Sequence, residues 1–307
     1  MARGDTPHLD GEPDGGPANQ REILARFETA IAEMRTRDIQ MGLRQLLAGT
    51  VPPGGEQAEE PAPVAELVRA VKTASARRQM QRLVGDAQLE RRVQIDTGTA
   101  ARMVRPYRWL LDRAGDGGLR LTEAGHLPPA EVAAAVQELK VPAPGGGPRE
   151  NQVPRVRQLR ESAQAMGLLR KEHGQLLVTT RGAELRFRPD ALWWHLAERM
   201  PLRSAAAGEV QPGLILLVCV AAGCTDTLSG TIARMLSAIG WMNDDGGPLT
   251  GAEAARATAG THATLRWLGA LPGETLPGET LPEEAGPGPW PTPEGVAFAR
   301  AALRSWP

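Results

Sequence analysis

Apolar residues recur at three- and four-residue spacing along most of the chain, a pattern typical of amphipathic helices. The spacing predicts helices over 21–48, 64–89, 97–113, 128–140, 151–166, 192–202, 213–223, 226–241 and 257–271. Short apolar stretches bounded by glycine or proline predict strands over 119–122, 168–170 and 175–179. We therefore expect a mainly α fold with short β-hairpins.

The stretch from Asn151 to Arg186 predicts one continuous motif. A helix is followed by a strand, a tight turn at Glu172–Gly174, a second strand and a short helix that Thr179 or Thr180 caps. This order is that of a winged helix-turn-helix, in which the helix can enter a DNA groove and the hairpin is the wing. The stretch therefore predicts a winged-helix module.

The helix predicted over 151–166 has one apolar face. Its predicted buried residues are Val153, Val156, Leu159, Ala163 and Met166. At about 100° per residue, this face leaves Arg157, Gln158 and Glu161 pointing outward. Arg155 and Arg160 are expected on the flanks of the outward face.

A weaker copy of the motif follows toward the C-terminus. Asp244–Thr250 is similar to Gly115–Thr122, and Trp290–Gly295 is similar to Val178–Gly182, with a Thr-x-x-Gly helix start in each. Between these two segments of the second copy, residues 273–282 form a tandem repeat, GETLPGETLP. This repeat lies within a predicted elongated acidic wing. The sequence thus predicts tandem winged helix-turn-helix modules preceded by N-terminal helices.

Composition divides the chain into four predicted regions. Residues 1–19 have almost no apolar side chains to bury and are expected to be disordered. An N-terminal helical region covers 20–96 and includes a linker at 51–63. The first module is predicted over 97–202 and the second, with the acidic wing, over 203–307.

Charge is close to balanced over the whole chain but unevenly distributed. The formal net charge is −1, which argues against a globally basic protein that binds nucleic acid non-specifically. Residues 69–108 contain ten Lys or Arg against three acidic residues, 149–188 contain nine against four, and 243–285 contain two against seven. Two interpretations are open: solvated helix faces, or a basic central surface beside an acidic C-terminal one.

Catalytic and phosphate-binding motifs are absent from the sequence. His195 and Glu198 have a spacing that can serve a metal, but the tryptophans beside them favour an amphipathic helix face. Cys219 and Cys224 are expected to face different ways on a helix, as buried thiols in a reducing cytoplasm. The longest apolar run, 214–222, is short of the roughly 20 residues that span a bilayer. We expect a non-enzymatic cytoplasmic protein without a metal, a cofactor or a membrane partner.

Four motifs carry a family resemblance: DRAGDGGLRLTEAGHLPP, GLLRKEHGQLLVTTRG, DALWWHLAERMPL and PTPEGVAFARAALR. They resemble the C-terminal region of actinobacterial proteins named after a plasmid ORF-three-like domain, also called a transposon-passenger domain. The resemblance covers about residues 20–307. The chain is expected to lack the named domain itself, so no activity and no functional residue is carried over.

Two functions fit these patterns. The first is DNA binding or transcriptional regulation through module one, since Arg and Gln can pair with base edges and wing cations suit phosphates. The candidate DNA-binding residues are Arg155, Arg157, Gln158, Arg160, Arg170 and Lys171. Glu161 opposes this hypothesis, because phosphates repel a carboxylate on the same face. The alternative is a protein–protein interaction scaffold, and the helices over 21–89 are expected to permit a homodimer.

Overall fold

The computed structural model describes residues 61–143, 148–202, 210–224, 228–271 and 291–305. Every described residue belongs to one compact unit, which covers residues 58–307. The predicted disordered tail, the predicted helix over 21–48 and the predicted elongated wing around 273–282 lie outside the described residues.

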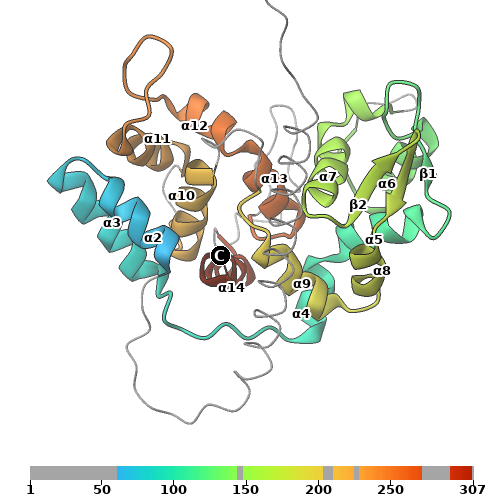
Figure 1. Cartoon of the computed structure of the whole chain (residues 1–307), viewed down its shortest axis with the longest axis horizontal. Coiled ribbons are helices and arrows are strands. Elements are labelled where there is room, and N and C mark those ends of the chain that lie inside the picture. Colours follow the sequence, from blue (N-terminus) through green and yellow to red (C-terminus); the bar gives the residue numbers. More distant parts are fainter. Residues whose placement is uncertain (1–60, 144–147, 203–209, 225–227, 272–290, 306–307) are drawn as a thin grey trace, which may run out of the picture. The chain divides into compact units, whose positions relative to one another are not determined.

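Helices predominate in the described part of the chain, as predicted, together with a small antiparallel sheet (Figure 1). The helices of the N-terminal and central part are α2 (Ala62–Ala70), α3 (Ala74–Ala87), α4 (Thr97–Met103), α5 (Arg105–Ala114), α6 (Pro129–Glu138), the 3-10 helix η2 (Glu150–Gln152), α7 (Pro154–Ala165), α8 (Thr180–Leu185) and α9 (Pro189–Glu198). The remaining helices are α10 (Val210–Ala221), α11 (Leu228–Ile239), α12 (Gly251–Ala257), α13 (Ala259–Trp267) and α14 (Pro293–Ser305). The strands are β1 (Leu119–Arg120), β2 (Leu169–Glu172) and β3 (Gln175–Val178).

Two predicted helices are each divided in the structure. The helix predicted over 64–89 is interrupted after Ala70, and the Thr73 side chain caps the second segment by accepting a hydrogen bond from Ala76 N. The helix predicted over 97–113 is interrupted at Val104, because Pro106 has no N–H to donate to the preceding turn; it lies instead in the first turn of a new helix that begins at Arg105. Proline is well tolerated in the first turn of a helix, so the break is local.

The sheet has the strand order β1-β3-β2. Leu119 pairs with Leu176, and Leu169 pairs with Val178. The hairpin between β2 and β3 closes through His173 and Gly174, whose φ angles of 47° and 74° are the two positive values that a tight two-residue turn requires. The predicted hairpin is therefore confirmed, with its turn where glycine was expected to permit it.

A single continuous apolar cluster runs through the described residues, from the N-terminal helices to α14. Helix α10 is central to it: every residue from Pro212 to Ala221 is buried, as its uniformly apolar sequence predicted. It packs against α3, α11, α13 and α14. The segments predicted as two modules consequently share one core, and α10 contributes to it from all sides.

Two arginine side chains of α14 donate hydrogen bonds to backbone carbonyls at the end of α3 and just after it. Arg300 Nε donates to the carbonyl of Ala87 at 2.6 Å, and Arg304 Nη1 donates to the carbonyl of Leu89 at 3.0 Å. Helix α3 also packs on α10 and α11. Within the described residues, the N-terminal helices thus belong to the common core, and pairing of two chains through residues 21–89 stays a prediction.

The predicted internal repeat is visible in two helix starts. Thr179 Oγ1 accepts from Gly182 N at 2.9 Å and donates to Gly167 O at 2.7 Å. Thr292 Oγ1 accepts from Gly295 N at 3.0 Å and donates to the carbonyl of Gly269 at 3.1 Å. Thr179 and Thr292 thus make corresponding contacts: each caps the helix that follows it and donates a hydrogen bond to the glycine after an earlier helix.

Both glycines of this repeat are held against a carbonyl oxygen. A Cβ placed on Gly182 would lie 2.3 Å from Leu168 O, and one on Gly295 would lie 2.4 Å from Ala270 O. We expect Gly182→Ala to lower the free energy of unfolding by about 1–3 kcal/mol, because backbone must shift to admit the methyl group. Urea denaturation measures the change.

Gly85 provides a control for which the expected change in the free energy of unfolding has the opposite sign. It lies inside α3, and a Cβ there would meet nothing within 4 Å. Gly85→Ala should raise the free energy of unfolding by about 0.5–1 kcal/mol through helix propensity alone. An equal gain in stability for Gly182→Ala would contradict the close approach at that site.

Candidate nucleic-acid interface

Helix α7 begins at Pro154, where the missing N–H of proline costs nothing, and the chain turns at Gly167 with φ of 73°. The apolar face predicted for this helix is confirmed. Its buried residues are Val153, Val156, Leu159, Ala163 and Met166. On the opposite side Arg157 and Glu161 are exposed, and Gln158 is half-buried.

Arg157 and Glu161 form an ion pair one helical turn apart. Arg157 Nε lies 3.6 Å from Glu161 Oε1, and both side chains are about half exposed. An exposed pair of this kind contributes only about 0.3–0.5 kcal/mol to stability. Its effect on the face is electrostatic, because the carboxylate offsets the cation nearest the centre of α7.

Arg160 does not lie on the flank of the exposed face, and that prediction is wrong. Its side chain is 8% exposed. The Nε atom donates to Glu150 Oε1 at 2.7 Å and Nη1 donates to Gln164 Oε1 at 2.7 Å. The guanidinium is thus enclosed among its partners, so Arg160 is not available as a DNA contact.

Glu150 explains why a charged arginine is tolerated there. Its carboxylate is buried, and besides Arg160 it accepts a hydrogen bond from the backbone N of Leu127 at 2.9 Å. His126 Nδ1 lies 3.2 Å from the same oxygen, Oε2. Glu150 therefore joins the turn before α6 to α7, and buried charges of this kind are tolerated only with such partners.

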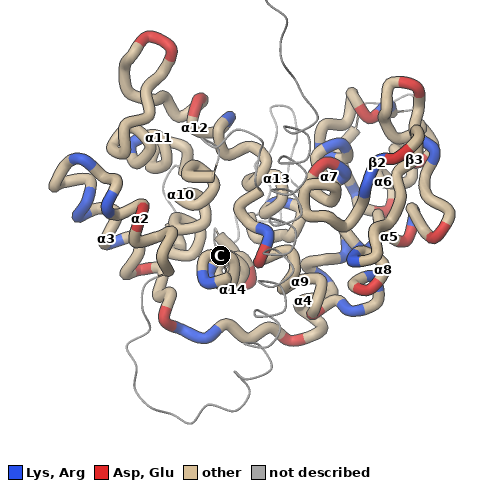
Figure 2. The backbone as a smooth tube through the Cα atoms, in the orientation of Figure 1, with Lys and Arg blue, Asp and Glu red and all other residues tan. Residues whose placement is uncertain are grey.

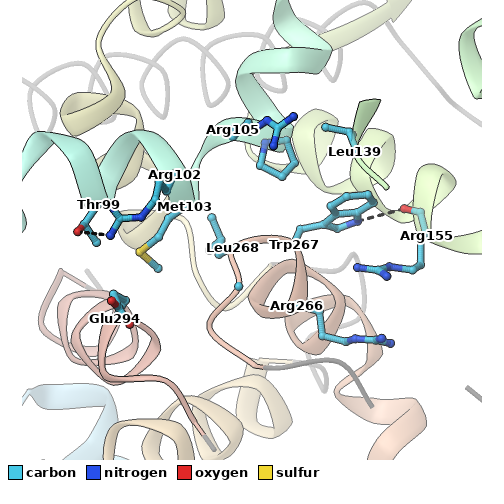
Figure 3. A pocket seen from close by; sticks show the side chains of 12 residues that line it. Thr99, Arg102, Met103, Arg105, Leu139, Arg155, Arg266, Trp267, Leu268 and Glu294 are labelled. Atoms are coloured by element: carbon cyan, nitrogen blue, oxygen red, sulfur yellow. Dashed lines mark hydrogen bonds between the residues drawn. The ribbon is translucent and has the colours of Figure 1, made fainter. Parts of the chain in front are cut away.

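Arg155 is turned toward α13. Its carbonyl accepts a hydrogen bond from Trp267 Nε1 at 3.1 Å, and its guanidinium carbon lies 5.0 Å from the centre of the same indole ring (Figure 3). Helices α7 and α13 pack side by side (Figure 1). Arg155 and Arg157 thus have different surroundings: Arg155 lies at a contact between two helices, and Arg157 is exposed.

The contact between α7 and α13 includes one buried phenol. Tyr107 Oη lies 3.0 Å from Ser162 Oγ and also hydrogen-bonds the side chain of Thr264, and burial raises the pKa of Tyr107 to about 12. Ser162 and Thr264 each lie five residues before the glycine that follows their helix. Equivalent positions of the two repeats thus meet at the same hydroxyl.

The hairpin keeps both of its predicted cations at the surface. Arg170 and Lys171 are exposed on β2, and they point to opposite faces of the sheet because they are adjacent in a strand. Arg170 forms an ion pair with Glu172. The ammonium group of Lys171 lies against the Gly125 turn. Figure 2 shows acidic and basic residues interspersed over α7 and the hairpin.

His195 is a buried core histidine. Its Nε2 lies 2.9 Å from the carbonyl of Met166, and burial lowers its pKa to about 4. The ring is therefore neutral at pH 7 and donates through Nε2. Across the described ranges, no group of three or more His, Cys, Asp or Glu side chains could hold a metal ion.

The two cysteines do not face different ways, contrary to the prediction. Helix α10 ends before Gly223, whose φ of 69° turns the chain back, so that Cys224 N donates to Cys219 O at 3.0 Å. The two thiols consequently form a hydrogen bond, which together with burial raises the pKa of Cys219. The prediction assumed that the helix continued through both residues.

No helix among the described residues is long and apolar enough to cross a membrane. Comparison of the chain with protein-family models, curated proteins and solved structures gives no match.

Proposed function

We propose that residues 97–202 and 203–307 form two winged helix-turn-helix modules. In the first, α5, β1, α6, α7, β2 and β3 follow one another in the order of a winged helix, and β1 completes the sheet beside β3. In the second, α11, α12 and α13 precede a helix start with the same threonine contacts as the first. The repeated contacts support a common architecture for both halves.

We infer that the first module is a non-enzymatic DNA-binding element. The observation that carries this inference is the exposure of Arg157 on α7, beside the half-buried Gln158, together with the exposure of Arg170 and Lys171 on the hairpin. An Arg or Gln on a helix can pair with base edges in the major groove, while hairpin cations contact phosphates. Arg160 has no part in this interface, and Arg155 lies at its margin.

Titration of labelled duplex DNA with the full chain at 50 and 200 mM salt tests the proposal. We expect salt-sensitive binding that weakens in Arg157→Ala/Arg170→Ala. If each arginine contacts one phosphate, the slope of log K against log salt should fall by about 1.8, or 0.9 for each contact. Arg234→Ala/Arg256→Ala removes equal charge from exposed positions of the second repeat and should leave binding unchanged. No binding of any duplex at 50 mM salt contradicts the proposal.

A protein-interaction role is the second candidate, and the contact of α13 with α7 favours it. The helix of the second repeat that corresponds to α7 has a buried face that includes Thr261, Thr264 and Trp267, and it binds another helix of the same chain. Winged-helix folds need not bind DNA. Recovery of a stoichiometric protein partner free of nucleic acid from a native extract, with no duplex binding, would favour this role. Recovery of nucleic acid alone would count against it.

A further inference from the structure

A cavity of about 360 Å³ lies where α4, α5, α7, α13 and the start of α14 come together. Its volume is within the range of about 300–1,000 Å³ that is usual for small-molecule sites. Figure 3 shows Arg155 and Arg266 near Trp267, and Arg102 and Glu294 on the far side of Leu268. The cavity is therefore built by residues from both repeats.

Positive charge dominates the wall of this cavity. Arg102, Arg105, Arg155 and Arg266 line it, and Glu294 is the one acidic residue among the described lining residues. Hydrogen bonds to uncharged groups orient two of these side chains: Arg102 Nη2 donates to Thr99 Oγ1 at 2.7 Å, and Arg105 Nη2 donates to the carbonyl of Glu138 at 3.0 Å.

Much of the remaining wall is apolar. Met103, Trp267 and Leu268 belong to the buried core, and Pro106 and Leu139 complete this surface. A guanidinium offers a planar fork of donors that matches phosphate and carboxylate oxygens. Arginines on both sides of an apolar wall suit a ligand with more than one anionic group and a carbon framework between or beside them.

We propose that this cavity binds a small organic polyanion, a molecule that carries several phosphate or carboxylate groups. The cavity is separate from the proposed DNA contacts, because none of Arg157, Gln158, Arg170 and Lys171 lines it. The polyanion site and DNA binding can therefore each be present or absent without the other.

Isothermal titration calorimetry of the full chain at 150 mM salt tests the site with three probes: ATP without magnesium, citrate and inorganic phosphate. ATP and citrate distinguish phosphate from carboxylate recognition. We expect saturable binding of one molecule of ATP or citrate per chain, with inorganic phosphate at least tenfold weaker. Arg102→Gln/Arg266→Gln should weaken that binding at least tenfold, and Arg234→Gln/Arg256→Gln, equally depleted in charge, should not.

A second variant keeps the arginines of the cavity and reduces the volume of the cavity. Leu139→Phe enlarges a side chain of the wall and should weaken ATP or citrate binding at least tenfold, with an unchanged far-ultraviolet circular dichroism spectrum as evidence of folding. The proposal is overturned by binding that does not saturate, by equal loss in Arg234→Gln/Arg256→Gln, or by no binding of ATP and citrate. Displacement of ATP by duplex DNA at matched phosphate concentration would also overturn it, since the cavity would then bind the DNA backbone.

Discussion

Glu150→Ala is expected to lower the free energy of unfolding by about 3–5 kcal/mol, because it removes the buried carboxylate that pairs with Arg160 and leaves that guanidinium only the exposed Glu161, 3.8 Å away. Arg160 is 7% exposed and Glu150 1% exposed, so water cannot readily replace the lost carboxylate. The backbone N of Leu127 loses its acceptor in the same variant. Urea unfolding followed by circular dichroism measures the loss.

Two further variants separate the ion pair from the general effect of mutation. Glu161→Ala removes the exposed carboxylate that lies 3.8 Å from Arg160 Nη2, and because this group is half exposed the loss should be no more than about 0.5 kcal/mol. Glu150→Leu/Arg160→Met removes both buried charges and should recover much of the loss, since apolar replacement of a whole buried pair is often neutral. A loss for Glu150→Ala as small as that for Glu161→Ala would refute the buried pair.

Trp193→Ala is the second substitution expected to have a large effect, with a loss of about 3–5 kcal/mol in the free energy of unfolding. The indole of Trp193 is fully buried. Its ring centre lies 5.3 Å from that of Phe298 at an interplanar angle of 88°, and Nε1 lies 3.2 Å from Met103 Sδ. Trp193 thus joins α9 to α14 and α4, and its removal leaves a cavity among all three.

Trp194 gives a matched comparison, because it is the next residue in α9 but only half-buried. Trp194→Ala removes the same group and should cost clearly less than Trp193→Ala under the same urea titration. Equal losses for the two variants would show that burial against α14 and α4 does not determine the effect.

The sequence predicted what short-range patterns determine. Val156, Leu159 and Ala163 identified the buried face of α7, since helical spacing is a local property. His173 and Gly174 identified the hairpin turn, because a two-residue turn needs positive φ at both positions. Helix α10 was predicted as central from its apolar residues alone. In each case the deciding information lay within one or two turns of chain.

The positions and contacts of side chains were harder to predict when they depended on residues distant in the sequence. Arg160 follows the polar pattern of its helix, and only the carboxylate of Glu150 beside it explains its burial. Arg155 is covered by Trp267, which is more than a hundred residues away in the sequence. The cavity combines arginines from four helices or helix ends, so no continuous motif marks it. A correct helical period leaves such contacts undetermined.

The packing of α7 against α13 has a consequence for the symmetry of any DNA target. Proteins of the helix-turn-helix class commonly read palindromes by presenting two equivalent helices to two half-sites one helical turn apart. In the proposed two-module arrangement, α7 and α13 occupy corresponding positions and pack against each other within a single polypeptide, and α7 is the one helix proposed to contact DNA. A bound chain should therefore protect one asymmetric half-site of DNA, and a palindromic target would have to recruit two separate chains.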